Sequence, residues 1–323
     1  MKKEQLELES AGVPGRPGKG AAAASLALSL LLALILIFFW EETRSLDFII
    51  SLQPRSAVVK SLFRAFTFLG DDQFFMLFFG VLIWCVDKKA GLRTGVVLLF
   101  SGIYSGLLKE LADLERPALP DIVHPENKAF PSGHALTAVV FWGYLAAQIG
   151  KTGFWLWAFL AIVMVSISRL VLGHHFLGDV LGGIALGIPF LLLMLYLIPL
   201  PAAKSRCKTL SLPLLTGLAV AVPLVLAVIV PGPDAPKLMG LLAGAAGGYI
   251  LEGEYVKLAV SAPFVKQVIK AVIGFSVLFG IVVGLGPLLP SSVHVLGFIR
   301  YGAGGLWVTF LAPALFKKLK LTA

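Results

Sequence analysis

Two histidines and an aspartate stand at spacings suited to catalysis in the middle of this 323-residue chain. His175 and Asp179 are four residues apart, so a helix would place them one turn apart on the same face. An aspartate in that position can hold one ring nitrogen of the histidine and leave the other as a nucleophile. His134 can act as general acid toward a leaving oxygen. These three residues are the predicted catalytic groups.

Three cations and a helix start accompany the histidines. Lys109, Arg116 and Arg169, which we call the clamp, offer positive charges. A guanidinium fork matches the oxygens of a phosphoryl group. Ser132 and Gly133 open a predicted helix, where a hydroxyl and a backbone N–H can add donors and the missing Cβ lets an anion approach. Because no cluster of carboxylates indicates a metal site, we expect the cations to take the role that Mg²⁺ plays elsewhere.

For the polar residues next to these positions in the sequence, we consider an ordinary structural role as well as a functional one. His174 would face about 100° away from His175 in a helix, so we expect it to be a second-layer or merely polar residue. His124 lies in a loop that either roofs the site or is simply solvated. Asp113 and Glu115 are expected to balance charge. Each motif alone is also common in proteins without this chemistry. An Arg-Pro pair ends a helix, and an arginine near a membrane face often extends its charged end to the interface.

The elements that must position these residues are membrane helices. The chain is 58% hydrophobic and only 14% charged, with a mean hydropathy of +0.91. A soluble domain is about 45–50% apolar and about 25% charged, so the composition excludes that class. The apolar runs are unbroken, which indicates helices and not barrel strands. The net charge of +9 is too scattered for nucleic-acid binding, and two cysteines exclude a disulfide framework.

The predicted fold class is an all-α, polytopic transmembrane helix bundle with a six-span core and about four further C-terminal spans. Residues 1–20 are predicted to be a disordered cytoplasmic tail, 21–200 the core, and 201–323 a C-terminal transmembrane extension. Segment 41–71 is too polar to span and is expected to form interfacial helix. The predicted spans are 21–40, 72–86, 94–112, 134–150, 154–172, 179–200, 212–231, 238–254, 271–289 and 301–316.

The basic residues predict an orientation. With the N-terminus inside, most of the 27 Lys and Arg residues fall on the cytoplasmic side, as the positive-inside rule requires. Both termini are then cytoplasmic, and the candidate site is extracytoplasmic. Short loops favour a prokaryotic inner or plasma membrane. Cys85 and Cys207 fall near the cytoplasmic side, where we expect free thiols without a catalytic role.

The order of the motifs resembles the type 2 phosphatidic acid phosphatase superfamily, which includes lipid phosphatases, acid phosphatases and haloperoxidases. Its signature reads K-x6-R-P, then P-S-G-H, then S-R-x5-H-x3-D. Here it is filled by KELADLERP (Lys109 to Pro117), PSGH (Pro131 to His134) and SRLVLGHHFLGD (Ser168 to Asp179). The predicted spans favour the integral-membrane branch over the soluble, vanadate-binding haloperoxidases. The extra C-terminal spans are similar in layout to the glucose-6-phosphatase and sphingosine-1-phosphate phosphatase branches.

The resemblance implies a metal-independent phosphatase that needs no cofactor and works through a phosphohistidine. His175 matches the nucleophile, His134 the general acid and Asp179 the orienting carboxylate. The matching phosphate-binding positions are Lys109, Arg116, Ser132, Gly133 and Arg169. The expected partners are a lipid phosphate and membrane lipids, with no nucleic acid and the oligomeric state open. Phosphotransfer to a sugar or lipid acceptor, and a non-catalytic binder or transporter, are the alternatives.

Neither the substrate nor the role of the C-terminal third follows from the motifs. Candidate substrates are phosphatidic acid, phosphatidylglycerol phosphate, undecaprenyl diphosphate, a sphingoid phosphate and a soluble sugar phosphate. His294 and Arg300 are expected on the outer side, where they either shape a substrate entrance or anchor an interfacial loop. The glycines between Gly240 and Gly248 predict close helix packing.

Overall fold

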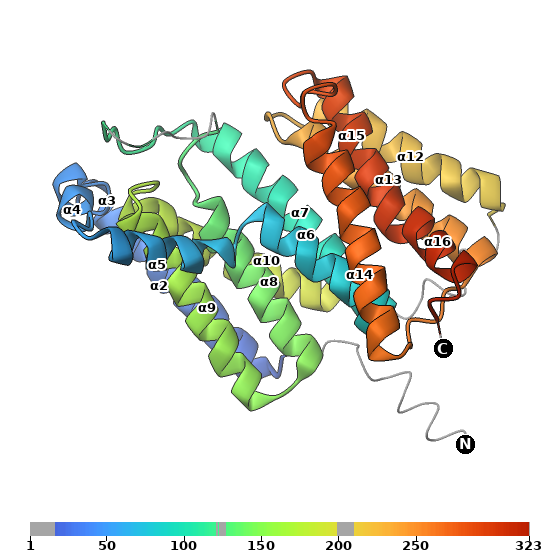
Figure 1. The fold of residues 1–323 in the computed structure, drawn as a ribbon. Coiled ribbons are helices and arrows are strands. Elements are labelled where there is room, and N and C mark those ends of the chain that lie inside the picture. Colours follow the sequence, from blue (N-terminus) through green and yellow to red (C-terminus); the bar gives the residue numbers. More distant parts are fainter. Residues whose placement is uncertain (1–16, 121, 123–126, 199–209, 323) are drawn as a thin grey trace. The chain divides into compact units, whose positions relative to one another are not determined.

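The structure is a computed structural model that describes residues 17–120, 122, 127–198 and 210–322. Every regular element in these residues is a helix, as predicted (Figure 1). The N-terminal helices are α2 (Lys19–Phe38), α3 (Trp40–Thr43), α4 (Leu46–Ser51), α5 (Ala57–Phe68), α6 (Asp72–Val81), the π-helical turn η1 (Leu82–Val86) and α7 (Lys88–Ala112). The next are α8 (Gly133–Ile149), α9 (Thr152–Val171), α10 (Leu177–Leu197), α12 (Leu212–Ile229) and α13 (Ala235–Leu251). The last are η3 (Glu252–Val256), α14 (Phe264–Phe279), η4 (Gly280–Gly284), α15 (His294–Leu306), η5 (Trp307–Leu311) and α16 (Ala312–Lys318).

The number of candidate membrane spans is smaller than the ten predicted. Among the described residues, seven helices are long and apolar enough to cross a membrane. An eighth span is formed if α5 is joined to α6–η1 across a bend of 49°. All ten predicted segments contain helix, but α8 and α13 have only 17 residues each, at the lower limit for a span. The chain is therefore an all-helical polytopic membrane protein, with seven or eight candidate spans in the part that the structure describes.

The chain folds into two compact units. One is formed by Met1–Phe75 with Phe100–Leu200, and the other by Met76–Leu99 with Pro201–Ala323. The division after Leu200 falls where the sequence predicts the end of the core. Residues 76–99 lie inside the predicted core but belong to the second unit.

Close helix packing in the first unit brings two helix starts together. Helix α10 packs against α2 and α8, and α9 packs against α8 and α5. The contact between α10 and α8 depends on glycines. A Cβ on Gly183 would lie 2.7 Å from the Ser132 carbonyl oxygen, and one on Gly187 would lie 3.1 Å from Val139 Cβ. Helices approach most closely where such small residues face each other, so Ser132 at the start of α8 lies beside α10.

The turn between α9 and α10 needs a left-handed residue. Gly173 has a φ of +71°, a conformation that only glycine adopts readily. Side chains of Leu119 and Ile122 also occupy the space that a Cβ there would need. This turn carries His174 and His175 toward α10.

Segment 41–71 is helical, as expected, but is divided among α3, α4 and α5. Helix α4 begins after Ser45, whose hydroxyl accepts a hydrogen bond of 3.3 Å from the Phe48 N–H. Since α5 and α6–η1 together are apolar enough to span, part of this segment can lie within the membrane and not along its surface. The interfacial position of the segment stays a prediction.

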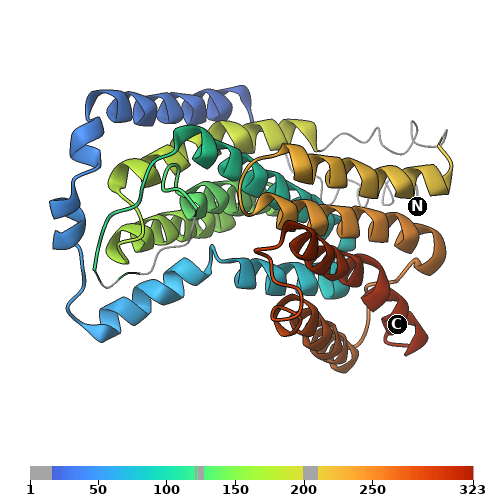
Figure 2. The same ribbon diagram turned by 90° about the horizontal axis from the view of Figure 1, so that it is seen from above.

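In the second unit, α13 packs against α12 and α15 (Figure 2). The main chain at Phe298 and Gly302 and the Thr309 hydroxyl fill the space that a Cβ would need on Gly240, Gly244 and Gly248. That contact confirms the prediction of close packing from these glycines.

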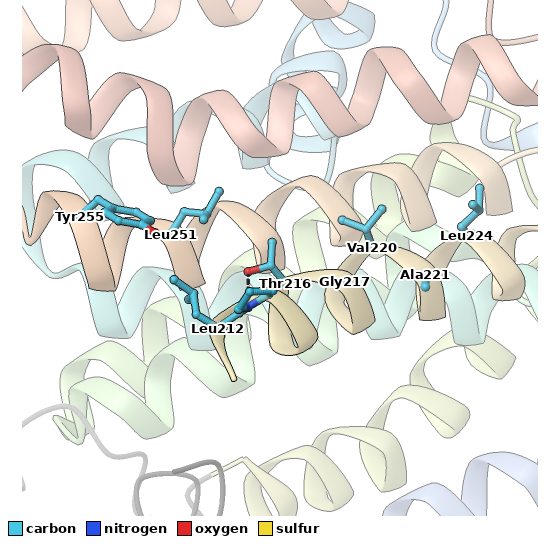
Figure 3. Close-up of a pocket in the computed structure, with 9 residues that line it drawn as sticks. Leu212, Thr216, Gly217, Val220, Ala221, Leu224, Leu251 and Tyr255 are labelled. Carbon is cyan, nitrogen blue, oxygen red and sulfur yellow. Dashed lines mark hydrogen bonds between the residues drawn. The ribbon is translucent and has the colours of Figure 1, made fainter. Parts of the chain in front are cut away.

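An apolar groove follows α12 and the end of α13 (Figure 3). Its lining includes Leu212, Val220 and Leu251, and its side-chain polar groups are the hydroxyls of Thr216 and Tyr255. These groups offer no charge to a phosphate, so the groove is not a candidate for the predicted chemistry. Cys85 is a free thiol, as predicted, and Cys207 lies outside the described residues.

Candidate active site

His175 lies between a carboxylate and a guanidinium in the first unit. Its Nδ1 is 3.4 Å from Asp179 Oδ2, and its Nε2 is 3.0 Å from Arg116 Nη1. A guanidinium can only donate hydrogen bonds, so Nε2 must accept and the ring proton must reside on Nδ1, facing the aspartate. The relative exposure of His175 is 1% and that of Asp179 is 0%. A buried imidazole therefore presents an unprotonated nitrogen to a cation.

The surroundings keep this imidazole neutral. Burial, followed by the positive charges of Arg116, Lys109 and Arg169, holds the pKa of His175 well below its usual 6.5. Both effects disfavour the protonated ring. At neutral pH Nε2 is consequently unprotonated, and its lone pair accepts the Arg116 hydrogen bond.

Arg44 contacts the carboxylate oxygen of Asp179 that His175 does not contact. Its Nη1 donates to Asp179 Oδ1 at 2.6 Å, while Asp179 Oδ2 accepts the Phe176 N–H at 2.9 Å. Arg44 Nη2 also donates to the Glu115 carbonyl at 2.8 Å, next to Arg116. Arg44 thus joins the aspartate to the segment that carries the arginine of the clamp. Sequence reasoning missed it, because the only signal was a cation in the polar segment 41–71.

Arg116 is fixed by contacts on three sides of its guanidinium. Nη2 donates to Asn127 Oδ1 at 2.6 Å and Nε donates to the Asn127 carbonyl at 3.1 Å. Nη1 donates to the His174 carbonyl at 2.8 Å. His174 therefore contributes its main chain, and it lies in a turn, so the helical placement considered for it does not apply. Burial lowers the pKa of Arg116, and the charge of Asp179 raises it.

Lys109 and Gly133 lie side by side. A Cβ on Gly133 would be 3.7 Å from Lys109 Cε, so the ammonium stem runs along the start of α8. Lys109 is 6% exposed, and its Nζ donates to the carbonyl groups of Lys128 and Ala129.

Ser132 connects the start of α8 to Asp179. Its N–H donates to the Asp179 carbonyl at 2.8 Å. Its hydroxyl is buried and has no hydrogen-bond partner among the described residues. A buried hydroxyl without a partner is costly unless a ligand meets it, so Ser132 suits an anion.

Arg169 and His134 have partners at the junction of α5 and α6. Arg169 Nη1 donates to Thr67 Oγ1 at 2.7 Å, and the buried Arg169 Nε has no partner among the described residues. His134 Nε2 lies 2.7 Å from Asp71 Oδ1. Thr67 and Asp71 were also missed, since nothing in their spacing distinguishes them from other polar residues at a helix end.

The remaining polar neighbours have simpler roles. Asp113 Oδ1 pairs with Lys128 Nζ at 2.5 Å, and this hydrogen bond and charge raise the pKa of Lys128. Asp113 thus balances a cation, although not one of the predicted clamp. Glu115 takes part through its carbonyl. His124 lies outside the described residues.

All eight predicted site residues lie in the first unit. Direct contacts join His175 to Asp179 and Arg116, and Ser132 to Asp179. Cations, a neutral imidazole and unsatisfied buried donors at one place suit a phosphoryl group undergoing nucleophilic attack.

Two family matches agree with this arrangement. Residues 90–201, which contain the eight residues, match the PAP2 superfamily. Residues 236–323 match the family described as PAP2 superfamily phosphatase, transmembrane extension.

Individual proteins with similar sequences carry lipid phosphatase names. The chain is 29% identical over 175 residues to a probable sphingosine-1-phosphate phosphatase of Dictyostelium discoideum, covering 48% of this chain and 43% of that protein. It is 35% identical over 91 residues to phosphatidylglycerophosphatase B of Bacillus subtilis (strain 168), covering 25% and 45%.

A solved structure, the first transmembrane PAP2 type phosphatidylglycerolphosphate phosphatase from Bacillus subtilis, is 24% identical with a TM-score of 0.45 and covers 54% of this chain and 93% of that one. The chain spans less than half of the length of the two relatives above. The two family matches together extend over more than half of the chain, which belongs to the PAP2 superfamily of phosphatases and carries its transmembrane extension.

Proposed function

We propose that this protein hydrolyses a phosphomonoester or diphosphate of a lipid at the extracytoplasmic face of the membrane, through a phosphohistidine. The observation that carries the proposal is the state of His175, whose Nε2 is unprotonated and lies 3.0 Å from Arg116. The names of the two relatives, which both refer to lipid phosphates, support a lipid substrate.

In the first step, the Arg116 Nη1–H turns from His175 Nε2 to a phosphoryl oxygen. The lone pair of Nε2 that this frees attacks phosphorus. An N–P bond forms as the bond from phosphorus to the lipid oxygen breaks. His134, protonated on both ring nitrogens, gives its Nε2 proton to that oxygen and becomes neutral. In the present structure Asp71 accepts from His134 Nε2, so the leaving oxygen must replace Asp71 as the acceptor. Asp179 stabilises the proton on His175 Nδ1. The clamp cations neutralise charge on the phosphoryl oxygens.

In the second step, water attacks the phosphohistidine. His134 takes a proton from this water, the N–P bond breaks, and its electron pair returns to Nε2. Inorganic phosphate leaves, and His134 is again protonated and held by Asp71. The cycle uses one water and returns both histidines to their starting states.

The test is phosphate release by the purified protein in detergent. The panel contains phosphatidic acid, phosphatidylglycerol phosphate, undecaprenyl diphosphate, a sphingoid phosphate and a sugar phosphate, each with excess chelator. Release from at least one lipid in chelator is expected. No release from any, or release abolished by chelator, would overturn the proposal. An added sugar or lipid acceptor distinguishes hydrolysis from phosphotransfer by the product formed.

The orientation is supported by the distribution of Lys and Arg along the chain. It can be tested with single cysteines in a background in which Cys85 and Cys207 are replaced by serine. An impermeant maleimide should label Arg55→Cys in intact cells and Lys318→Cys only after lysis. The reverse pattern would place the site on the cytoplasmic face.

A further inference from the structure

Arg300 is a buried cation in the second unit that the proposed chemistry does not use. It is 7% exposed and is the seventh residue of the candidate span His294–Lys318, so it lies about 9 Å along the helix from its start. Its described contact is with the Tyr301 ring, 5.2 Å from the guanidinium carbon. Arg300 has no ion pair among the described residues, and its buried Nε has no hydrogen-bond partner there.

The other two buried charges that the structure describes in this unit differ from Arg300. Glu252 pairs with Lys88 at 2.6 Å. Lys270 donates to the carbonyl groups of Trp84 and Val260, at 2.7 and 2.9 Å. Burying a charge is costly unless it is paired, and an ionisable residue within a span tends to mark a functional site. Arg300 therefore lacks the anion that its position calls for.

The loop before α15 leaves space for the guanidinium. A Cβ on Gly286 would lie 3.0 Å from Arg300 Nη1 and 2.9 Å from the Val283 carbonyl oxygen. Farther along, a Cβ on Gly297 would lie 3.3 Å from Ser291 Cα, so the loop folds back onto α15. Main chain thus lies along the guanidinium without supplying a negative charge.

Exposed apolar side chains occur in the same loop and the first turns of α15. Leu288, Val293, Val295 and Ile299 are all exposed. A cation among exposed apolar side chains matches an amphiphile, whose phosphate meets the arginine while its acyl chains cover the apolar surface. A free anion would gain nothing from these side chains.

We propose that Arg300 binds the phosphodiester group of an anionic membrane phospholipid, at a site formed by α15 and the loop that precedes it. The guanidinium fork can donate two parallel hydrogen bonds to the phosphate oxygens. This site is composed of residues of the second unit only and is independent of the proposed catalysis.

The test is lipid binding by the full-length protein. Delipidated protein in detergent is titrated with phosphatidylglycerol and followed by native mass spectrometry. Arg300→Gln should weaken the binding of one lipid about tenfold, as loss of a charge-assisted bidentate contact predicts. Arg64→Gln, which removes an exposed arginine, is the control of equal charge and should bind like wild type. The clamp cations are the same throughout the series.

Two further variants keep the positive charge. Arg300→Lys should bind with intermediate affinity, because an ammonium cannot form the bidentate contact. Gly286→Ala should weaken binding because its Cβ crowds Nη1. Equal binding by wild type and Arg300→Gln would overturn the proposal. If Arg300→Gln does not fold, Gly286→Ala and Arg300→Lys decide, and binding by both that equals wild type would overturn it. Displacement of the lipid by inorganic phosphate would also overturn it, by assigning a site for free anions.

Discussion

A buried ion pair of the second unit and the buried donors of the candidate site in the first unit serve different purposes. In the second unit, the Glu252 carboxylate pairs with Lys88 Nζ at 2.6 Å and accepts a hydrogen bond from the Leu258 N–H at 2.8 Å. In the first unit, Ser132 Oγ and Arg169 Nε are buried donors that the described residues leave without partners. A buried charge whose hydrogen bonds are complete within the fold stabilises that fold, whereas several incomplete donors around a neutral histidine indicate a ligand.

Removing the nucleophile tests this contrast most strongly. His175→Ala should lower phosphate release by about 10⁴-fold or more, the scale seen when a nucleophile is lost from other covalent catalysts. Folding should survive, because the buried ring is replaced by a smaller side chain and the fold keeps its other contacts. The measurement is initial-rate phosphate release with a folding check by circular dichroism. His294→Ala, an exposed histidine of the second unit, should keep full activity. A His175→Ala enzyme with more than a tenth of wild-type activity would contradict the assignment.

Arg44 is expected to act through Asp179 and not on the substrate. Without the 2.6 Å contact, the carboxylate loses its counterion and is free to turn away from His175. We expect Arg44→Ala to lower kcat about 10–100-fold, the range for residues that orient a catalytic group, with little change in KM. Arg44→Lys should recover part of the loss.

The control for this prediction is Arg55→Ala, which removes an exposed arginine of the same segment and should leave kcat unchanged. If Arg44→Ala raised KM without lowering kcat, Arg44 would be a substrate-binding residue and the positioning role would be wrong.

The cation beside His175 should set the acid limb of the pH profile. In the proposed mechanism the neutral ring is the nucleophile. Its pKa is lowered from 6.5 by burial and by the charge of Arg116, so activity should persist as pH falls through 6.5. Arg116→Gln removes that charge, so the pKa of His175 rises and the acid limb of kcat/KM moves to higher pH. Lys128→Gln, which removes a more distant cation, should leave the limb in place. An unchanged limb in Arg116→Gln would show that the arginine does not act on the ring.

The contact between His175 and Asp179 was accessible from sequence because its geometry is local. A spacing of four residues fixes His175 and Asp179 on one face wherever the chain is helical or nearly so, and the structure places them 3.4 Å apart. The helical class was equally accessible, since it follows from unbroken apolar runs. The number of spans was harder to predict, because α8 and α13 contain 17 residues each, which is the lower limit of length for a membrane span.

The groups that hold the predicted catalytic residues could not be found in this way. Arg44 lies 135 residues from Asp179, and Asp71 lies 63 residues from His134. Only packing of α3–α5 against the rest of the first unit brings them together, and no periodicity records that packing. The anion site at Arg300 likewise depends on where the loop at Gly286 lies, so the sequence could offer only two alternatives for this arginine.

The smallest expected effect on turnover comes from the paired charges of the second unit. Glu252→Gln removes the counterion of Lys88 but can still accept the Leu258 N–H. We expect unfolding to become easier by about 3 kcal/mol, the lower end of the range for a broken buried pair, because 21% of the Lys88 side chain is exposed. Phosphate release per folded molecule should change less than about twofold, because this ion pair stabilises the fold and takes no part in ligand binding. The double variant Lys88→Met with Glu252→Gln should lose less stability than the sum of the single variants, which is the mark of direct coupling. A large fall in kcat at unchanged stability would remove the distinction between the two units, because a complete ion pair would then be serving catalysis.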